Sequence, residues 1–276
     1  ITLIFAIGIF SSCEKNNLNT EDSLKETVNL HIDSLRTNLN QLSNCTKIEA
    51  AKIEFSKCRI NYKKIEPFVE YYFQGFSRRI NGPNLPDIKI DDNIVNDATG
   101  FQVIEELIFS KEELDLAKFK SEIEIVKTDL LFVKNNLKDM PIQNHHLYEL
   151  LQHQIIRNAT MGITGFDSPV AFQSIEETYH SITGLENYFL IFSDKNDITG
   201  KEKCQKLFSN CRDYLGQNKD YDSFNRLVFI KKYLMPLSVE LENSFKNHLK
   251  GIPEGQKLFK GTLAQFNILI VACNSS

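Results

Sequence analysis

The stretch IEAAKIEFSKCRINYKKIEPFVEYYFQGF, residues 48–76, decides the fold. Apolar side chains recur along it at alternating intervals of three and four residues, at Ile48, Ala51, Phe55, Cys58, Tyr62, Ile65, Val69, Tyr72 and Phe76. This spacing places them on one face of a single long helix. Pro67 lies inside the stretch, where it removes a backbone donor and clashes with the preceding turn, so the sequence predicts a kink there.

The same spacing continues through most of the chain. Before this stretch it predicts a helix that begins near Asp22 and buries Leu24, Val28, Leu35, Leu39 and Leu42. After it, helical patterns open at Gly100 and cover residues 116–137 and 144–161. Residues 79–97 are rich in Pro, Gly and Asp, so we expect this segment to form an excursion from the helical body and not a core helix.

The second half of the chain repeats the helical pattern. Helices are expected around residues 175–192 and 204–215 and from about Ser223 onward, the last with a kink at Pro236. The loop at residues 162–169 is rich in helix breakers and predicts a hinge between two helical halves. No alternating strand pattern of useful length is found, so we expect an all-α protein built of antiparallel helical bundles in two lobes.

Bulk composition excludes one class of function. The chain has 276 residues, of which 42% are hydrophobic, enough to fill a substantial core. Its 32 basic residues are mixed among 36 acidic ones, and the formal net charge is -4. No basic field is therefore available to attract nucleic-acid phosphates.

The first residues have the character of an export signal. Residues 1–12 are apolar up to Phe10 and resemble the end of a signal peptide, and the following Ser11-Ser12-Cys13 resembles the lipobox of bacterial lipoproteins. We expect Cys13 to be lipidated, residues 13–21 to form a polar tether and residues 22–276 to form the folded domain. The alternative is a signal peptide cut elsewhere. A lipid anchor would hold the protein to a membrane of the bacterial cell envelope, on the periplasmic or outer-membrane side.

The other cysteines are odd in number, at Cys45, Cys58, Cys204, Cys211 and Cys273. If Cys204 and Cys211 share a helix, seven residues at a rise of about 1.5 Å put them roughly 10 Å apart. That separation is too great for a disulfide, whose Cα atoms lie within about 7 Å of each other. These two cysteines are expected to be core residues.

A first candidate site is the helix start Gly100-Phe101-Gln102-Val103-Ile104-Glu105. Its apolar residues share one face, and Gln102 and Glu105 fall beside that face at the edge of the core. Reactive sites often begin in this way. So does an ordinary helix start, where carboxylates favour the positive end of the helix.

Charged residues of both signs also run along the long helix, at Arg59, Lys63, Glu66 and Glu70. As pairs four residues apart, they are expected to solvate and stabilise that face. In the alternative interpretation, Arg59 or Glu66 turns inward against Gln102 and Glu105. A buried polar pair of that kind can fix the register of a bundle without any ligand.

A metal half-site is a further possibility in the pattern His146, Glu149 and His153, whose spacings of three and four share one helix face. With Glu105 these residues make a candidate set for zinc or iron. The alternative is an exposed helix face carrying His and Glu. The sequence has no C-x-x-C-H, so no covalently held haem is expected, and no G-x-S-x-G for a serine nucleophile.

Several short motifs, in this order, resemble the imelysin-like domain, in particular the version found ahead of di-haem cytochrome c peroxidase domains in bacterial envelope proteins. They are residues 62–72 (YKKIEPFVEYY), 80–86 (INGPNLP), 100–107 (GFQVIEEL), 166–171 (FDSPVA) and 222–227 (DSFNRL). The family motif is G-x-H-x-x-E, suspected of binding metal and linked to peptidase activity. Gly100 and Glu105 match it, but Gln102 stands where the family has His, and an amide is a poor zinc or iron ligand compared with imidazole.

The resemblance implies a two-lobed helical fold and a choice of functions. We expect a non-catalytic binding or partner module of the cell envelope, with an iron-uptake protein or a cytochrome c peroxidase as its partner. One alternative is a metal-dependent hydrolase of the peptidase type that uses Glu105 as ligand or base. Another is that the chain is a fragment or remnant of a longer peroxidase fusion.

Overall fold

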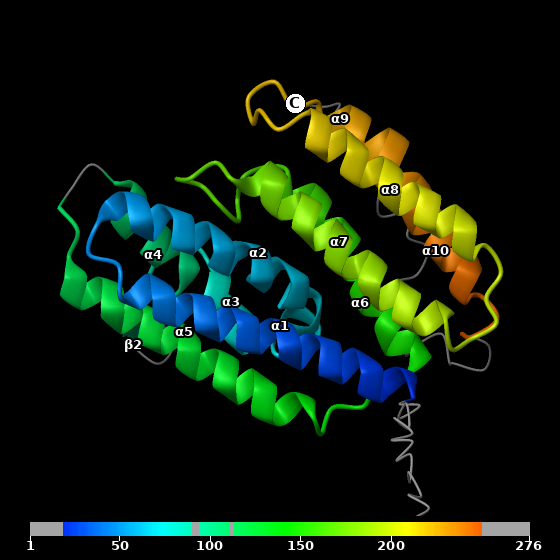
Figure 1. The fold of residues 1–276 in the computed structure, drawn as a ribbon, viewed down its shortest axis with the longest axis horizontal. Helices are drawn as coiled ribbons and strands as arrows, with labels where there is room; N and C mark the ends of the chain where they lie inside the picture. The colour runs from blue at the N-terminus through cyan, green and yellow to red at the C-terminus, as the bar shows by residue number, and fades with distance from the viewer. Residues whose placement is uncertain (1–18, 90–93, 111–112, 250–276) are drawn as a thin grey trace, which may run out of the picture.

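The computed structural model describes residues 19–89, 94–110 and 113–249, and most of that length is helical (Figure 1). The prediction of an all-α protein is therefore confirmed. Residues 1–12, Cys13 and Cys273 lie outside the described ranges. Within those ranges no helix is both long enough and apolar enough to cross a membrane.

The first half of the chain forms one group of packed helices. Its helices are α1 (Thr20–Ser43), α2 (Ile48–Tyr72), α3 (Gln74–Asn81), α4 (Phe101–Phe109) and α5 (Leu116–Leu137). Only a short turn joins α1 to α2, so the two helices run antiparallel, and α5 packs against the other side of α1. Asn19 caps α1 by accepting the backbone N–H of Asp22 at 2.8 Å.

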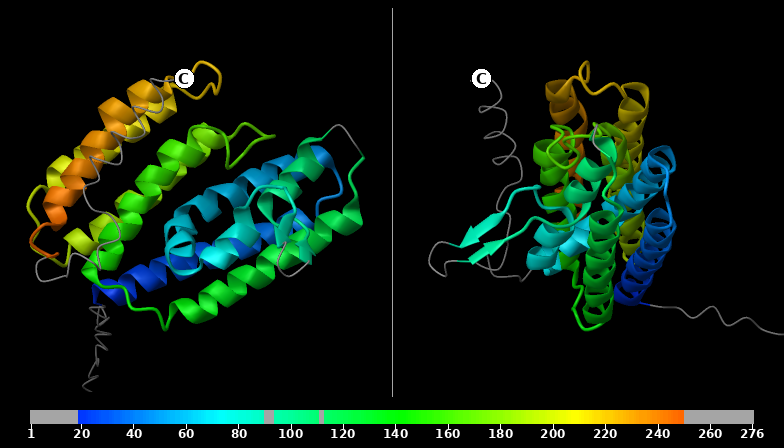
Figure 2. Two further views of the ribbon diagram at one scale, coloured as in Figure 1. Left: turned by 180° about the vertical axis from the view of Figure 1, so that it is seen from behind. Right: turned by 90° about the vertical axis from the view of Figure 1, so that its left-hand side faces the viewer.

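The second half forms a second group, drawn in green to orange in Figures 1 and 2. It comprises α6 (Asn144–Arg157), the π-helical turn η1 (Asn158–Gly162), α7 (Ser174–Ser193), α8 (Lys201–Gln217), α9 (Arg226–Phe229), the π-helical turn η2 (Ile230–Leu234) and α10 (Met235–Phe245). The two groups meet where α2 packs on α6 and α7. Gly184 allows the close approach of α7, because a Cβ there would lie 3.1 Å from the Cα of Lys64.

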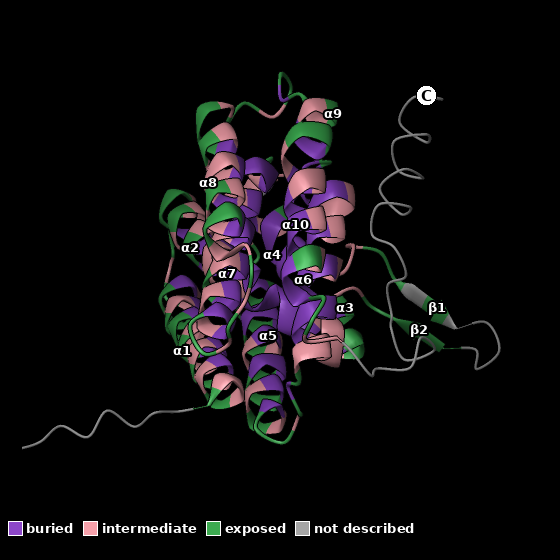
Figure 3. Ribbon diagram, turned by 90° about the vertical axis from the view of Figure 1, so that its right-hand side faces the viewer, coloured by how far each residue is buried: buried purple, intermediate pink, exposed green. Residues whose placement is uncertain are grey.

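Helix α2 is at the centre of this arrangement and bears out the sequence pattern. Six of its predicted apolar positions are buried: Ala51, Phe55, Cys58, Tyr62, Ile65 and Val69. The α-helix continues through Pro67 and ends at Tyr72, before the last predicted apolar position, Phe76, which belongs to α3. The burial colours of Figure 3 show such inward faces along most of the helices.

Near Pro236 the chain departs from a regular α-helix. Proline clashes with the carbonyl four residues before it, here that of Lys232. The turn that contains Lys232 is η2, a π-helical turn placed directly before Pro236. The irregularity predicted at Pro236 is therefore taken up as a wider helical turn, and the helical segment begins at Arg226 instead of Ser223.

The excursion expected from the helical body is present, and it contains strands that the sequence did not predict. The excursion after α3 contains two short strands, β1 (Asp87–Lys89) and β2 (Ile94–Asn96), paired antiparallel with Ile88 opposite Val95. Three-residue strands are too short to leave an alternating pattern that sequence inspection detects. The strands form a ribbon that projects from the helical body (Figures 2 and 3).

The four cysteines in the described part of the chain are free thiols. Cys204 and Cys211 both lie on α8 and are buried, as expected of core residues. Burial raises the pKa of the Cys211 thiol to about 12. Such a thiol stays protonated at neutral pH and is a poor nucleophile.

Candidate functional site

Four residues singled out from the sequence are buried at the junction of the two halves. Arg59 and Glu66 on α2 are 1% and 0% exposed, and Gln102 and Glu105 on α4 are 3% and 1% exposed. The expectation that Arg59, Lys63 and Glu66 solvate an exposed face was wrong. Arg59 and Glu66 do turn inward, but their hydrogen-bond partners are other residues than Gln102 and Glu105. Buried charges need partners, so their contacts define the site.

Arg59 ties α2 to the second half and to the end of α3. Its guanidinium donates to both carboxylate oxygens of Glu177 on α7, at 2.8 and 2.6 Å. It also donates to the backbone oxygen of Asp167 at 2.8 Å and to the side-chain oxygen of Asn81. A fork of N–H donors fits a carboxylate in this two-pronged way, and lysine could not replace it.

A second ionic centre lies one turn along α2. The ammonium of Lys63 donates to Glu66 at 2.8 Å and to Asp167 at 2.7 Å. Arg157 of α6 approaches Glu66 at 3.3 Å and Asp167 at 3.2 Å, and also Glu70 at 3.1 Å. Asp167 thus receives cations from both halves.

Most of the charges in this centre are buried in pairs. Three cations, Arg59, Lys63 and Arg157, face three buried carboxylates, Glu66, Asp167 and Glu177, and the partly buried Glu70 lies at the edge beside Arg157. We call these six residues the ionic cluster. Balanced and hydrogen-bonded charges are the arrangement in which burial of ions is tolerated.

Glu105 does not join the ionic cluster directly but holds the neighbouring loop. Its Oε1 accepts the hydroxyl of Ser168 at 2.9 Å and the backbone N–H groups of Val170 and Ala171 at 3.2 and 2.6 Å. Its Oε2 has no hydrogen-bond partner among the described residues. The carboxylate therefore fixes the segment that precedes α7.

Gln102 binds the same loop from one turn earlier on α4. Its amide nitrogen donates to the backbone oxygen of Phe166 at 3.1 Å and lies 3.5 Å from that of Asn81. The amide oxygen, the only atom of Gln102 that could bind a metal ion, is a poor ligand for zinc or iron compared with imidazole. Together, Gln102, Glu105, Arg59 and Lys63 hold the loop between η1 and α7 with buried hydrogen bonds.

Gly100 is required where α4 begins. Its φ is +94°, in the region that favours glycine, and its backbone N–H donates to Glu122 at 3.1 Å. A Cβ at this position would lie 2.2 Å from the backbone oxygen of Arg79. The glycine of the motif therefore allows the start of α4 to pack on the end of α3.

The pKa shifts follow from burial and from the ion pairs. Burial by itself would raise the pKa of Asp167, but the charges of Lys63 and Arg157 outweigh it and the pKa is lowered. Burial would lower the pKa of Lys63, yet Asp167 and Glu66 outweigh that and raise it. For Glu105, burial prevails over the nearby Arg59, and its pKa is raised.

The predicted metal ligands are not drawn together. Glu149 accepts the hydroxyl of Tyr71 at 2.5 Å, and the His146 ring lies 2.8 Å from the backbone oxygen of Pro141. His153 lies on the same helix as these two residues, and burial lowers the pKa of its ring. Glu105 lies on α4 and accepts backbone N–H groups of the loop before α7. Among the described residues no group of three or more His, Cys, Asp and Glu side chains is arranged to hold a metal ion.

Gln154 of α6 also belongs to the site, because its amide nitrogen donates to Glu66 at 2.6 Å. Sequence reasoning missed several members of the site, namely Asn81, Gln154, Arg157, Asp167 and Glu177. One feature of the sequence could have indicated that the charged residues of α2 belong to the site. Arg59, Lys63, Glu66 and Glu70 each follow one residue after an apolar position of α2, so they repeat its spacings of four and three. Such a polar stripe flanks the buried face and is half turned toward the core.

Two pockets lie beside the cluster. One, of about 170 Å³, is lined by Asn81, Arg157 and Asp167 together with residues of α2 and α3. The other, of about 470 Å³, lies between α3 and the ribbon and is lined by Arg78, Arg79 and Leu85 among others. The first is smaller than the 300–1,000 Å³ or so that is usual for small-molecule sites.

A search against protein-family models finds no match for this chain, and a search of curated proteins finds none either.

Proposed function

We propose that this chain is a non-catalytic partner-binding module of the imelysin-like kind, in which the ionic cluster fixes the base of a protruding ribbon that contacts another protein. The observation that carries the proposal is the exposure of the ribbon's apolar side chains. Ile88 and Val95 face each other across the two strands and are 62% and 63% exposed, and Leu85 beside them is 68% exposed. An apolar patch on a projecting element is typical of a protein contact.

The ribbon is built on rigid supports. Its first strand follows Asn81, which accepts a hydrogen bond from Arg59, and its second precedes Gly100, whose N–H is bound by Glu122. Thr99 also donates to the backbone oxygen of Arg79 at 3.1 Å, which joins the two ends of the excursion. A binding element held in place before binding loses less entropy on association.

The chemistry of the surface indicates the kind of partner. Two short strands leave backbone donors and acceptors at both edges of the ribbon, and an extended segment of another protein can pair with such an edge. We propose an envelope protein with an extended apolar segment, and the resemblance directs the first tests to iron-uptake proteins and cytochrome c peroxidases.

Site-specific photo-crosslinking in the source bacterium tests the proposal. A photoreactive amino acid at Ile88 is expected to give one discrete adduct, whereas the same group at Ile53 of α2 gives none. Ile53 is a matched control because it is 60% exposed but lies away from the ribbon. The adduct's partner is then purified and titrated with the protein and with an Ile88→Ser variant, which should bind more weakly. Equal adducts at the two positions, or an adduct only with a second copy of the chain, would overturn the proposal.

The alternative of a metal-dependent hydrolase has one observation in its favour, the unpartnered Oε2 of Glu105. The other oxygen is occupied by three donors, and the amide of Gln102 is a poorer zinc or iron ligand than the imidazole of the family motif. Metal analysis of the purified protein and of a Glu105→Ala variant distinguishes a metal-dependent hydrolase from a partner-binding module. Stoichiometric zinc or iron that is lost in the variant would favour the hydrolase over the partner module.

A further inference from the structure

A small pocket beside the ionic cluster is lined by charged side chains of both signs. Its volume is about 170 Å³. Two arginines line it, Arg78 of α3 and Arg157 of α6, together with two carboxylates, Glu70 of α2 and Asp167 of the loop before α7. The other lining residues are uncharged. Because cations and anions are equal in number, the lining suits a ligand that carries both charges better than a simple anion or a simple cation.

Arg157 has hydrogen-bond donors to offer to such a ligand. Its contacts with Glu66, Glu70 and Asp167 all run through one nitrogen, Nη2. Its Nε is buried and has no hydrogen-bond partner among the described residues. The guanidinium therefore keeps N–H groups that these carboxylates do not use, and a bound carboxylate can accept from them in charge-assisted hydrogen bonds.

Glu70 provides the complementary negative charge. Arg157 approaches it at 3.1 Å, yet burial prevails and raises the pKa of the Glu70 carboxyl. At Asp167 burial is outweighed by Lys63 and Arg157, and the pKa is lowered. The charge of Glu70 is thus the less compensated of the two, and an ammonium group in the pocket would stabilise it.

The size and the apolar wall of the pocket restrict the ligand further. A water molecule takes up about 30 Å³ in the liquid, so the pocket has room for roughly five or six non-hydrogen atoms. That is the size of glycine or alanine. Pro83, Met161 and Phe166 also line the pocket and offer apolar surface to a methyl group.

We propose that this pocket binds a small zwitterionic α-amino acid of about the size of alanine, with its carboxylate on Arg157 and Arg78 and its ammonium group on Glu70. The two charged groups of such a ligand are attached to one carbon. They match the side chains of Arg157 and Glu70, which lie in contact with each other.

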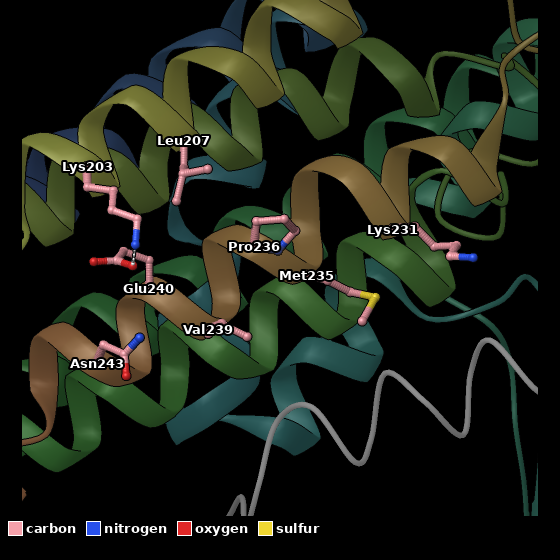
Figure 4. Close-up of a pocket in the computed structure, with 8 residues that line it drawn as sticks. All are labelled: Lys203, Leu207, Lys231, Met235, Pro236, Val239, Glu240 and Asn243. Carbon is pink, nitrogen blue, oxygen red and sulfur yellow. Dashed lines mark ion pairs between the residues drawn. The ribbon is translucent and has the colours of Figure 1, made fainter.

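The methionine methyl groups allow a direct test by nuclear magnetic resonance. The chain has three methionines, Met140, Met161 and Met235. Met161 lines the pocket, whereas Met235 lines a separate groove between α8 and α10 (Figure 4). When L-alanine is added to the whole protein with isotope-labelled methionine methyl groups, we expect the Met161 signal to shift until saturation and the other two to stay in place. A Met161→Leu variant assigns the signal.

Matched ligands and variants distinguish the zwitterion from other occupants. Acetate and methylammonium each carry one of the two charges and should bind at least about tenfold more weakly than alanine. Arg78→Gln and Glu70→Gln should each weaken alanine by a similar factor. Arg79→Gln is the control, because Arg79 is the next residue of α3 and does not line this pocket. Unshifted Met140 and Met235 signals show that each variant is folded.

Three results would overturn the proposal. The first is a Met161 signal that millimolar alanine and glycine leave unmoved. The second is acetate binding as tightly as alanine, which would make the pocket a simple anion site. The third is an equal loss of alanine binding in the Arg78→Gln and Arg79→Gln proteins, which would place the ligand elsewhere.

Discussion

The guanidinium of Arg59 and the carboxylate of Glu177 form two parallel hydrogen bonds, at 2.8 and 2.6 Å, with both side chains buried. One residue belongs to α2 and the other to α7, so this pair joins the two halves of the chain. Around it the ionic cluster holds the loop that precedes α7. The contacts of this centre lead to specific expectations for stability.

Removal of Arg59 should be among the most damaging single changes. An Arg59→Met variant removes both hydrogen bonds from the buried Glu177 and leaves Lys63, at 3.8 Å, as its nearest cation, so we expect a loss of about 3–5 kcal/mol in the free energy of unfolding. Lys201→Met is the control, because in its ion pair with Asp194 the two side chains are 36% and 62% exposed, and pairs of that kind contribute about 0–1 kcal/mol. Urea unfolding followed by circular dichroism measures both. A loss at Arg59 no larger than at Lys201 would show that the Arg59–Glu177 pair is not buried in solution.

Glu105 should act through its Oε1 as an acceptor. In a Glu105→Gln variant the amide oxygen can accept the same donors, so stability at neutral pH should change by less than about 1 kcal/mol. Glu105→Ala leaves the N–H groups of Val170 and Ala171 without their acceptor, at a cost of about 1–3 kcal/mol. Hydrogen exchange at Ala171 should rise in the alanine variant only. Equal exchange in the two variants would contradict this role.

Acid should weaken the fold through Asp167. Its pKa is lowered in the folded protein, so its contribution to stability is present above the unfolded pKa of about 3.9 and is lost as the pH falls through the lower folded value. Unfolding free energies measured from about pH 6 down to about pH 2 should therefore decline. In an Asp167→Asn variant that part of the decline should be missing, although the protein is less stable at neutral pH because Lys63 has lost a partner. An unchanged acid profile in the variant would assign the decline to other carboxylates.

The glycine of the motif should tolerate no side chain. At Gly100 the φ of +94° disfavours other residues, and a Cβ would meet backbone oxygen of Arg79 at 2.2 Å. Gly100→Ala should cost more than the 1 kcal/mol or so that separates glycine from alanine in helices. Gly216→Ala on α8 is the control, since a Cβ there meets nothing within 4 Å, and it should be neutral or stabilising. Thermal unfolding of the two variants compares them directly, and equal melting temperatures would refute the packing argument.

The helices could be read from the sequence because long, regular spacings leave little ambiguity. The face of α2 and the start of α4 at Gly100 follow directly from residue order. The ribbon could not be read, because three-residue strands whose Ile88 and Val95 are exposed show no burial pattern.

The candidate site could be predicted from the sequence only in part. Arg59, Glu66, Gln102 and Glu105 were recognised as positions at the edge of the core, but their partners were not. Glu177 lies 118 residues after its partner Arg59, and Asp167 lies 104 residues after its partner Lys63. No local spacing connects residues so far apart, and only the packing of α7 on α2 brings them together.

The same separation governs how the protein folds. While α7 is unfolded, α2 can bury its apolar face against α1, but Arg59 and Lys63 then lack the carboxylates of Glu177 and Asp167. In a half-folded chain these cations stay in water, and they can be buried only together with their carboxylates, because burying an unpaired charge is costly. The two halves should therefore fold in one cooperative step, and slowly, because the closing contacts span more than a third of the chain.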